Sequence, residues 1–129
     1  MEKPEVRPVR WIASSRDDLR EFPAKVRHVA GTALYFAQTG AKHPNVKPLK
    51  GIVKGAGVLE IVTDHASNTF RTVYTVSFPE VVYVLHTFQK KSKKGIETPK
   101  HEVQLIRARY ELARRDYEAE FKSKKEEGQ

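Results

Sequence analysis

The 129-residue sequence contains no cysteine, so neither a disulfide nor a thiolate metal site can stabilise its fold. It also has no apolar run that approaches the roughly 18 residues of a membrane helix. The charged start, MEKPEVRPVR, is not followed by the apolar segment of a signal peptide. A chain without cysteine suits a reducing compartment. We therefore expect a cytoplasmic protein with no membrane contact.

The motifs of most enzyme classes are missing as well. The five histidines are scattered, and no two lie at the spacing of metal ligands; they are His28, His43, His65, His86 and His101. The sequence has no glycine motif that cradles a phosphate and no nucleophile elbow. We expect no metal or other cofactor.

Positive charge, in contrast, is abundant. Lysine and arginine total 24 against 16 acidic residues, which gives a formal net charge of +8. Such a balance favours binding to nucleic acid, an anionic membrane surface or an acidic protein.

The residue pattern predicts four strands and three helices. The first helix begins after a cap at Ser14 or Ser15 with Asp17 or Asp18 in the capping-box spacing, and Thr98 caps the last helix. Strands are expected over 9–14, 58–64, 69–78 and 81–88, and helices over 15–22, 23–40 and from Pro99 onward. Residues 41–57, rich in proline, glycine and lysine, are expected to form an ordered loop.

This order predicts an α+β fold in which an antiparallel β-meander carries helices on one face. The two N-terminal helices pack on the sheet, and a C-terminal helix follows. Its apolar stripe docks on the sheet, a partner or both. We expect a single domain over 1–129, with an ordered core over about 9–121 and a flexible tail over 122–129.

Arg71 lies inside an otherwise apolar strand, where an unpaired guanidinium is costly. One interpretation is a salt bridge to Glu60 on the neighbouring strand. The other is a bidentate clamp on a phosphate, which the planar guanidinium suits. The two interpretations are compatible.

A lysine cluster follows the last predicted strand; its members are Lys90, Lys91, Lys93 and Lys94. Such a run is often only a solvated surface. Aromatic residues on the strands that lead to it, Tyr74, Tyr83 and Phe88, favour binding to single-stranded RNA, because exposed bases stack on such rings. Lysines of the long loop, Lys50 among them, are candidates to close the same groove.

His86 and Tyr74 each have a structural and a functional interpretation. His86 shares a strand face with Phe88 and is either a core histidine with a hydrogen-bond partner or a proton donor and acceptor near neutral pH. Tyr74 is either an RNA-stacking ring or part of the core, and core packing is favoured.

Taken together, FRTVYTV, LHTFQKKSKKG and the following TP resemble motifs of the RelE/ParE superfamily of bacterial toxins. The closest likeness is to its HigB-like, phage-derived branch, which has a YRvvY-type strand and then an LHxFxKKsxKTP segment. The elements KPLKG and LEI also occupy matching places, and the resemblance spans about residues 11–112. One departure is Val62, which stands where the branch often has a basic residue, and Lys50 is the candidate to replace it.

The resemblance implies the toxin of a type II toxin–antitoxin system, which cuts messenger RNA on the ribosome without a metal. Its implied partners are a cognate antitoxin, expected to be a helix-turn-helix protein, the ribosome and mRNA. By this likeness Arg71 with Lys90 or Lys91 stabilises the phosphate, and a lysine or His86 handles protons. Lys50, Tyr74, Phe88, Lys93 and Lys94 are the expected RNA contacts. The alternatives are a ParE-like poison of DNA gyrase and a non-catalytic RNA-binding module.

Overall fold

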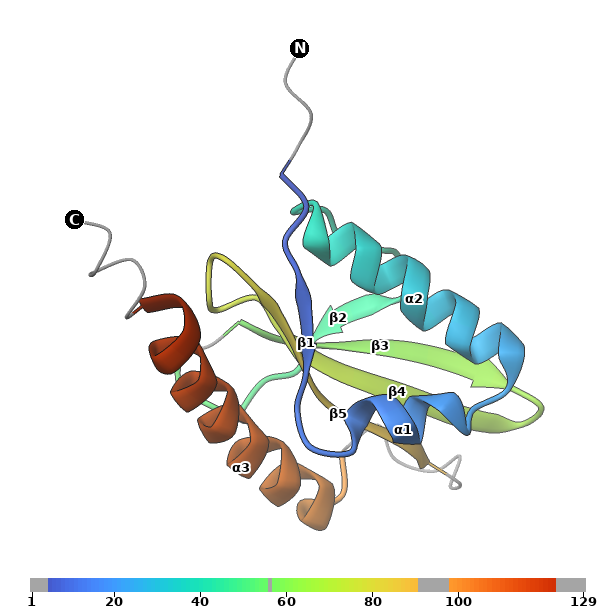
Figure 1. Ribbon diagram of the computed structural model, residues 1–129. Helices are drawn as coiled ribbons and strands as arrows, with labels where there is room; N and C mark the ends of the chain where they lie inside the picture. The colour runs from blue at the N-terminus through green and yellow to red at the C-terminus, as the bar shows by residue number, and fades with distance from the viewer. Residues whose placement is uncertain (1–4, 56, 91–97, 123–129) are drawn as a thin grey trace.

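The centre of the computed structural model, which describes residues 5–55, 57–90 and 98–122, is a five-stranded sheet. Its strands lie in the order β1-β5-β4-β3-β2 (Figure 1). Their bounds are β1 Val9–Trp11, β2 Val46–Pro48, β3 Val58–His65, β4 Asn68–Thr75 and β5 Val82–Lys90. The α+β class predicted from the sequence is confirmed.

Strands β3, β4 and β5 form the predicted antiparallel meander. The β3–β4 hairpin closes at the His65–Asn68 pair, which leaves only Ala66 and Ser67 in the turn. Both turn residues have positive φ, 48° and 69°. A two-residue turn of this kind matches the right-handed twist of the strands it joins, so the register of the hairpin is fixed locally.

The sheet is mixed, which corrects the purely antiparallel prediction. β1 pairs with β5 in parallel, with Val9 opposite Val82 and Trp11 opposite Val84. At the other edge, β2 arises from the segment predicted to be a loop and pairs antiparallel with β3. Both edge strands are three residues long. Strands this short carry too few residues for alternation to reveal their pairing.

Helices cover both faces of the sheet: the two N-terminal helices pack on one face, as predicted, but the last helix packs on the other, so the prediction that all helices share one face is wrong. α1 (Ser15–Arg20) and α2 (Ala24–Gln38) lie on one side, and α3 (Lys100–Tyr117) lies on the other (Figure 1). A short π-helix, η1 (Glu118–Lys122), extends α3. None of the helices described here is long and apolar enough to cross a membrane.

Each face has its own apolar core because strand residues alternate between the two faces. The face under α1 and α2 buries Leu34 and Ala33 of α2 against Ile61, Val82 and Val84. The face under α3 buries Ile106 and Ala113 of α3, with partners that include Val73, Tyr83 and Leu85. The predicted apolar stripe of the last helix therefore docks on the sheet.

Of the predicted helix caps, Ser14 is the N-cap position of α1 but makes no side-chain capping bond, and Thr98 is not the cap of α3. The Ser14 hydroxyl donates to the Asp18 carboxylate at 2.7 Å instead of capping a backbone N–H of α1. Pro99, not Thr98, is the N-cap position of α3. The Thr98 hydroxyl is buried and has no hydrogen-bond partner within the described part of the chain.

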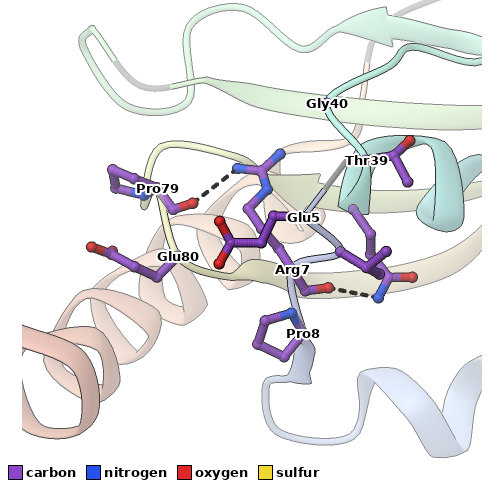
Figure 2. Close-up of a pocket in the computed structure, with 9 residues that line it drawn as sticks. Glu5, Arg7, Pro8, Thr39, Gly40, Pro79 and Glu80 are labelled. Atoms are coloured by element: carbon purple, nitrogen blue, oxygen red, sulfur yellow. Dashed lines mark hydrogen bonds between the residues drawn. The ribbon is translucent and has the colours of Figure 1, made fainter. Parts of the chain in front are cut away.

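The segment before β1 is tied to the end of α2 by Arg7. Its guanidinium donates to the carbonyl of Ala37 at 2.7 Å and to that of Pro79 at 3.4 Å. In return, the Gln38 side-chain amide donates to the Arg7 carbonyl at 2.6 Å. Figure 2 shows the Arg7 side chain directed toward Pro79, in a surface pocket that Glu5 and Gly40 also line. Arg7 thus gives a second donor to the Ala37 carbonyl in the last turn of α2, which also accepts from the Gly40 N–H.

Candidate functional site

Charged residues cross the sheet on the face that α3 partly covers. Lys47 of β2 lies directly opposite Glu60 of β3, and Arg71 of β4 is a diagonal neighbour of Glu60. Arg71 Nη1 donates to Glu60 Oε1 at 2.8 Å, and Lys47 Nζ lies 3.7 Å from the same oxygen. One carboxylate therefore serves two cations from the strands on either side of it. We call Lys47, Glu60 and Arg71 the cross-strand triad.

Two members of the triad are buried. Arg71 is 4% exposed and Glu60 is 2% exposed, whereas the Lys47 side chain is 49% exposed. Burying either charge without the other is strongly unfavourable, so each residue needs a counter-ion, which the other provides. The salt bridge expected from the sequence is confirmed. The second interpretation of Arg71, as a phosphate clamp, stays a prediction.

The pairing inside the triad is incomplete. Glu60 Oε2 and Arg71 Nε are buried and have no hydrogen-bond partner within the residues the structure describes. A buried polar atom without a partner costs free energy. The pair consequently retains one acceptor and one donor that a further group can use.

Lys90 continues this charged face onto β5. Phe88 is paired with Arg71, and Lys90 with Thr69, so Arg71 and Lys90 are diagonal neighbours on one face. Diagonal partners in an antiparallel pair have Cβ atoms about 7 Å apart. The pairing brings the predicted catalytic residues Arg71 and Lys90 together. Lys91, Lys93 and Lys94 lie outside the described residues.

His86 connects β5 to α3. Its Nδ1 accepts a hydrogen bond from Arg109 Nη1 at 2.9 Å, and its Nε2 contacts the Glu102 carboxylate. Arginine can only donate, so Nδ1 is unprotonated and Nε2 carries the proton that Glu102 accepts. Both ring nitrogens are therefore occupied. The predicted proton-handling role of His86 stays a prediction and requires that one partner move away.

Burial lowers the pKa of His86 below its ordinary value, and the positive charge of Arg109 acts in the same direction. The hydrogen bond and charge of Glu102 oppose this shift, as does the more distant Asp18. The pKa is lowered on balance, because desolvation of the imidazolium is the largest of these effects. His86 is therefore neutral at pH 7.

The predicted stacking residues are buried. Phe88 packs on the His86 ring with centroids 5.2 Å apart, within the core under α3. Tyr74 is 1% exposed and lies on the opposite face, in the core under α2. The core role favoured for Tyr74 is the one observed, since a ring enclosed there is not accessible to a base. The structure does not bring Tyr74 to the face that carries Arg71.

Lys50 is exposed on the loop between β2 and β3, at a cleft beside α3. Arg107 of α3 fixes this loop by donating to the carbonyls of Gly51 at 2.7 Å and Ile52 at 2.8 Å. Thr98 and Val103 line the same cleft. Lys50 therefore belongs to the α3 side of the sheet, as does the cross-strand triad.

Sequence reasoning did not identify Glu102 and Arg109 as partners of His86. They lie seven positions apart on α3, and residues at that spacing share one helix face. The spacing was thus a usable signal that α3 carries a polar pair beside its apolar stripe. It gave no information on which strand residue the pair would meet.

No group of three or more histidine, aspartate and glutamate side chains is placed to hold a metal ion in the described ranges 5–55, 57–90 and 98–122.

The comparisons with known proteins give a family and a likeness to solved structures. The family described as phage-derived protein Gp49-like (DUF891) matches residues 17–111. No curated protein matches the sequence. Among solved structures, the chain is similar to one from the toxin–antitoxin complex RelBE2 of Mycobacterium tuberculosis. The two are 17% identical with a TM-score of 0.45, over 71% of this chain and 100% of the other. The match to the family covers most of the sequence and agrees with the phage-derived branch that its motifs resemble: the chain belongs to the Gp49-like family of phage-derived proteins.

Proposed function

We propose that this protein is the toxin of a type II toxin–antitoxin system and that it cuts messenger RNA on the ribosome. The observation that carries the proposal is the shared sheet face of Arg71, Lys90 and Lys47, three cations on three different strands. Membership of the phage-derived family and the motif resemblance to the RelE/ParE superfamily support the same activity. An endoribonuclease of this kind acts in the cytoplasm, where translated messages are found.

The reaction that fits these residues is attack of the RNA 2′-oxygen on the adjacent phosphorus. The P–O5′ bond breaks, a 2′,3′-cyclic phosphate forms, and the leaving 5′-oxygen takes up a proton. A base must accept the proton of the 2′-hydroxyl, and cations must stabilise the charge that gathers on the phosphate. We assign phosphate stabilisation to Lys90 and, once its buried guanidinium becomes accessible, to Arg71, with Lys91 as the further candidate.

Proton transfer is assigned to the lysine cluster in preference to His86. His86 takes part only if Glu102 or Arg109 releases its ring. Lys50, Lys93 and Lys94 are the proposed contacts to flanking RNA phosphates, and Phe88 is a proposed base contact only if its ring leaves the core.

A cognate antitoxin is the proposed protein partner. A chain with a net charge of +8 favours an acidic segment over its cationic face. The proposed ligands of the active protein are the ribosome and the message bound in its decoding site.

The experiment is expression of the chain without its antitoxin, followed by mapping of RNA 5′ ends. We expect growth arrest and cuts at fixed positions within codons of translated messages. Lys90→Ala should lower the cutting rate by about 100-fold, the typical cost of removing one group that stabilises transition-state charge. Lys25→Ala is the matched control, because it removes an exposed lysine from α2 on the other side of the sheet.

Two results would contradict the proposal. Growth arrest with uncut messages excludes mRNA cleavage, and inhibition of purified gyrase in a supercoiling assay would then favour the gyrase poison. Equal loss of activity in Lys90→Ala and Lys25→Ala would indicate that only total charge matters, as in a non-catalytic RNA-binding module.

A further inference from the structure

We propose that Glu60 is a positioning residue that acts as an internal counter-anion: its carboxylate holds Arg71 and Lys47 in the free protein until a phosphate of the RNA backbone displaces it. This inference rests on the proposed function in one respect, that RNA is the ligand. It goes beyond the salt bridge expected from the sequence, because it concerns how both cations are held before RNA arrives and what releases them.

The geometry of the triad is the first support. Glu60 Oε1 accepts from Arg71 Nη1 at 2.8 Å while Lys47 Nζ lies 3.7 Å away. One anionic oxygen shared by a guanidinium and an ammonium is the arrangement in which proteins also bind a phosphate oxygen. The Glu60 carboxylate therefore occupies the position that a substrate phosphate needs.

The unpaired atoms are the second support. Arg71 Nε, although buried, has no hydrogen-bond partner in the described residues, so the guanidinium does not make the bidentate contact it is capable of. Glu60 Oε2 is likewise buried and unpaired. A pair optimised only for stability would use both oxygens and two donors. The incomplete pairing favours an exchangeable contact over a purely structural one.

Access to the triad is through Lys47. It is the member with a half-exposed side chain, while its ammonium group is close to Glu60 Oε1. A phosphate that binds Lys47 from solvent thus comes next to the Glu60 carboxylate and repels it. Rotation of that carboxylate away from Arg71 frees the guanidinium for the phosphate.

Because of this role, the loss of the Glu60 charge should change folding stability and nucleic-acid affinity in opposite directions. Glu60→Gln keeps the size of the side chain but removes its charge, so the buried Arg71 loses its counter-ion and the folded state should be less stable. The same change removes the competitor of phosphate, so affinity for nucleic acid should rise. Even with the full screening of bulk water, removing one unit of repulsion at about 4 Å corresponds to about fivefold in the dissociation constant.

The test is binding of a single-stranded oligonucleotide of 2′-deoxynucleotides, which supplies phosphodiesters but lacks the 2′-hydroxyl needed for cleavage. Dissociation constants at about 50 mM salt and thermal midpoints are measured for the wild-type protein, Glu60→Gln and Asp17→Asn. Asp17→Asn is the matched control, since it converts an acid to an amide at a side chain that is 83% exposed on α1. We expect tighter binding and a lower midpoint for Glu60→Gln, and neither change for Asp17→Asn.

A folded Glu60→Gln that binds the oligonucleotide with unchanged or weaker affinity overturns the inference. A similar gain in affinity for Asp17→Asn also overturns it. The same holds if none of the three proteins binds the oligonucleotide. If Glu60→Gln does not fold, the wild-type protein provides the test: the Arg71 side-chain Nε–H resonance, assigned with Arg71→Lys, is followed by NMR during titration. Movement of that resonance supports displacement of Glu60, and an unmoved resonance at saturation overturns it.

These results are independent of the cleavage assay. If translated messages remain uncut while Glu60→Gln binds the oligonucleotide more tightly, the nuclease proposal is wrong and the proposed role of Glu60 is supported. If messages are cut while Glu60→Gln shows no gain in affinity, the nuclease proposal is supported and the proposed role of Glu60 is wrong.

Discussion

The two faces of the sheet are built from the same strands but carry different kinds of residue. Ile61 and Glu60 are sequence neighbours on β3 and are almost equally buried, yet Ile61 packs against apolar residues under α2 whereas Glu60 pairs with Arg71. The face under α1 and α2 buries apolar residues and neutral hydrogen bonds, such as those from the Ser15 hydroxyl to the Val84 carbonyl and from the Thr87 hydroxyl to the Ser15 carbonyl. The face under α3 combines an apolar core with buried charges that stability does not require, since apolar residues of similar volume often serve as well.

The comparison indicates that the two faces of the sheet have different roles. If stability were the only requirement, apolar residues would be expected on both faces of the sheet, because a buried ion pair contributes little net stability. The charges instead lie on neighbouring strands, at Lys47 of β2, Glu60 of β3, Arg71 of β4 and Lys90 of β5. The α3 side is therefore the side to perturb for function, and the α2 side is the side to perturb for stability alone.

The largest effect is expected from Arg71→Ala. It leaves the Glu60 carboxylate buried beside only Lys47, and breaking a buried pair in this way costs about 4 kcal/mol of unfolding free energy. Replacing both partners by apolar residues, Glu60→Leu with Arg71→Met, should cost only about 1 kcal/mol, because no charge is left unpaired. Urea denaturation measures both values, and a double variant less stable than Arg71→Ala would contradict this account of the charged face.

Ile61→Ala on the apolar face should cost about 3 kcal/mol, the usual price of a cavity at a fully buried site. Unlike changes to the triad, it should leave the affinity of the folded protein for the deoxyoligonucleotide unchanged. Denaturation and binding assays on the same sample provide the measurement. A loss of affinity at temperatures where Ile61→Ala is fully folded would remove the functional distinction between the faces.

A smaller, pH-dependent effect is expected at His86. Its pKa is lowered in the folded state, so the unfolded chain binds the extra proton more readily as the pH falls. The contribution of neutral His86 is present above about pH 6.5, the ordinary value, and is lost as the pH falls from there toward the folded-state pKa. His86→Gln, which cannot titrate, should therefore flatten the decline of stability between about pH 7 and pH 5.

Denaturation midpoints measured at a series of pH values test this expectation, with His28→Gln on the exposed part of α2 as the control. An identical slope in wild-type and His86→Gln proteins would contradict the assignment of a neutral His86 between Glu102 and Arg109.

The smallest effect is expected from Arg10→Ala. Arg10 of β1 pairs with Asp116 of α3 at 2.7 Å, but its side chain is well exposed. Water and salt screen such a pair, so its removal should cost about 0.5 kcal/mol. Tyr83, which also donates to Asp116, keeps the carboxylate partnered. A loss as large as that of Ile61→Ala would show that β1 and α3 depend on this contact far more than exposure indicates.

Much of the fold was predictable because its central elements have strong local patterns. The β3–β4–β5 meander follows from alternation and short turns, and α2 from its apolar stripe between Pro23 and Gly40. The parallel β1–β5 pairing and the β2 edge strand were not predictable in the same way. Each is three residues long, and each depends on a distant strand for its hydrogen bonds.

The candidate site was predictable where neighbouring strands determine it. The Glu60–Arg71 pair follows from the β3–β4 hairpin, whose two-residue turn fixes the register. The partners of His86 do not follow from the sequence, because they depend on how α3 docks and on a β-bulge. Val73 is paired with His86 while Tyr74 is paired with Val84, so Leu85 is the extra residue on β5. That one insertion brings both Leu85 and His86 to the α3 side.

The parallel pairing of β1 with β5 has a consequence for synthesis of the chain. Val9 leaves the ribosome early but has no partner until Val82 follows it, with the whole β2–β4 segment made in between. A nascent chain that stops before β5 lacks the strand that lies between β1 and β4 and cannot assemble the sheet. Premature termination upstream of β5 should therefore yield fragments that lack the sheet and its cationic face, so translation through β5 is a precondition for the fold.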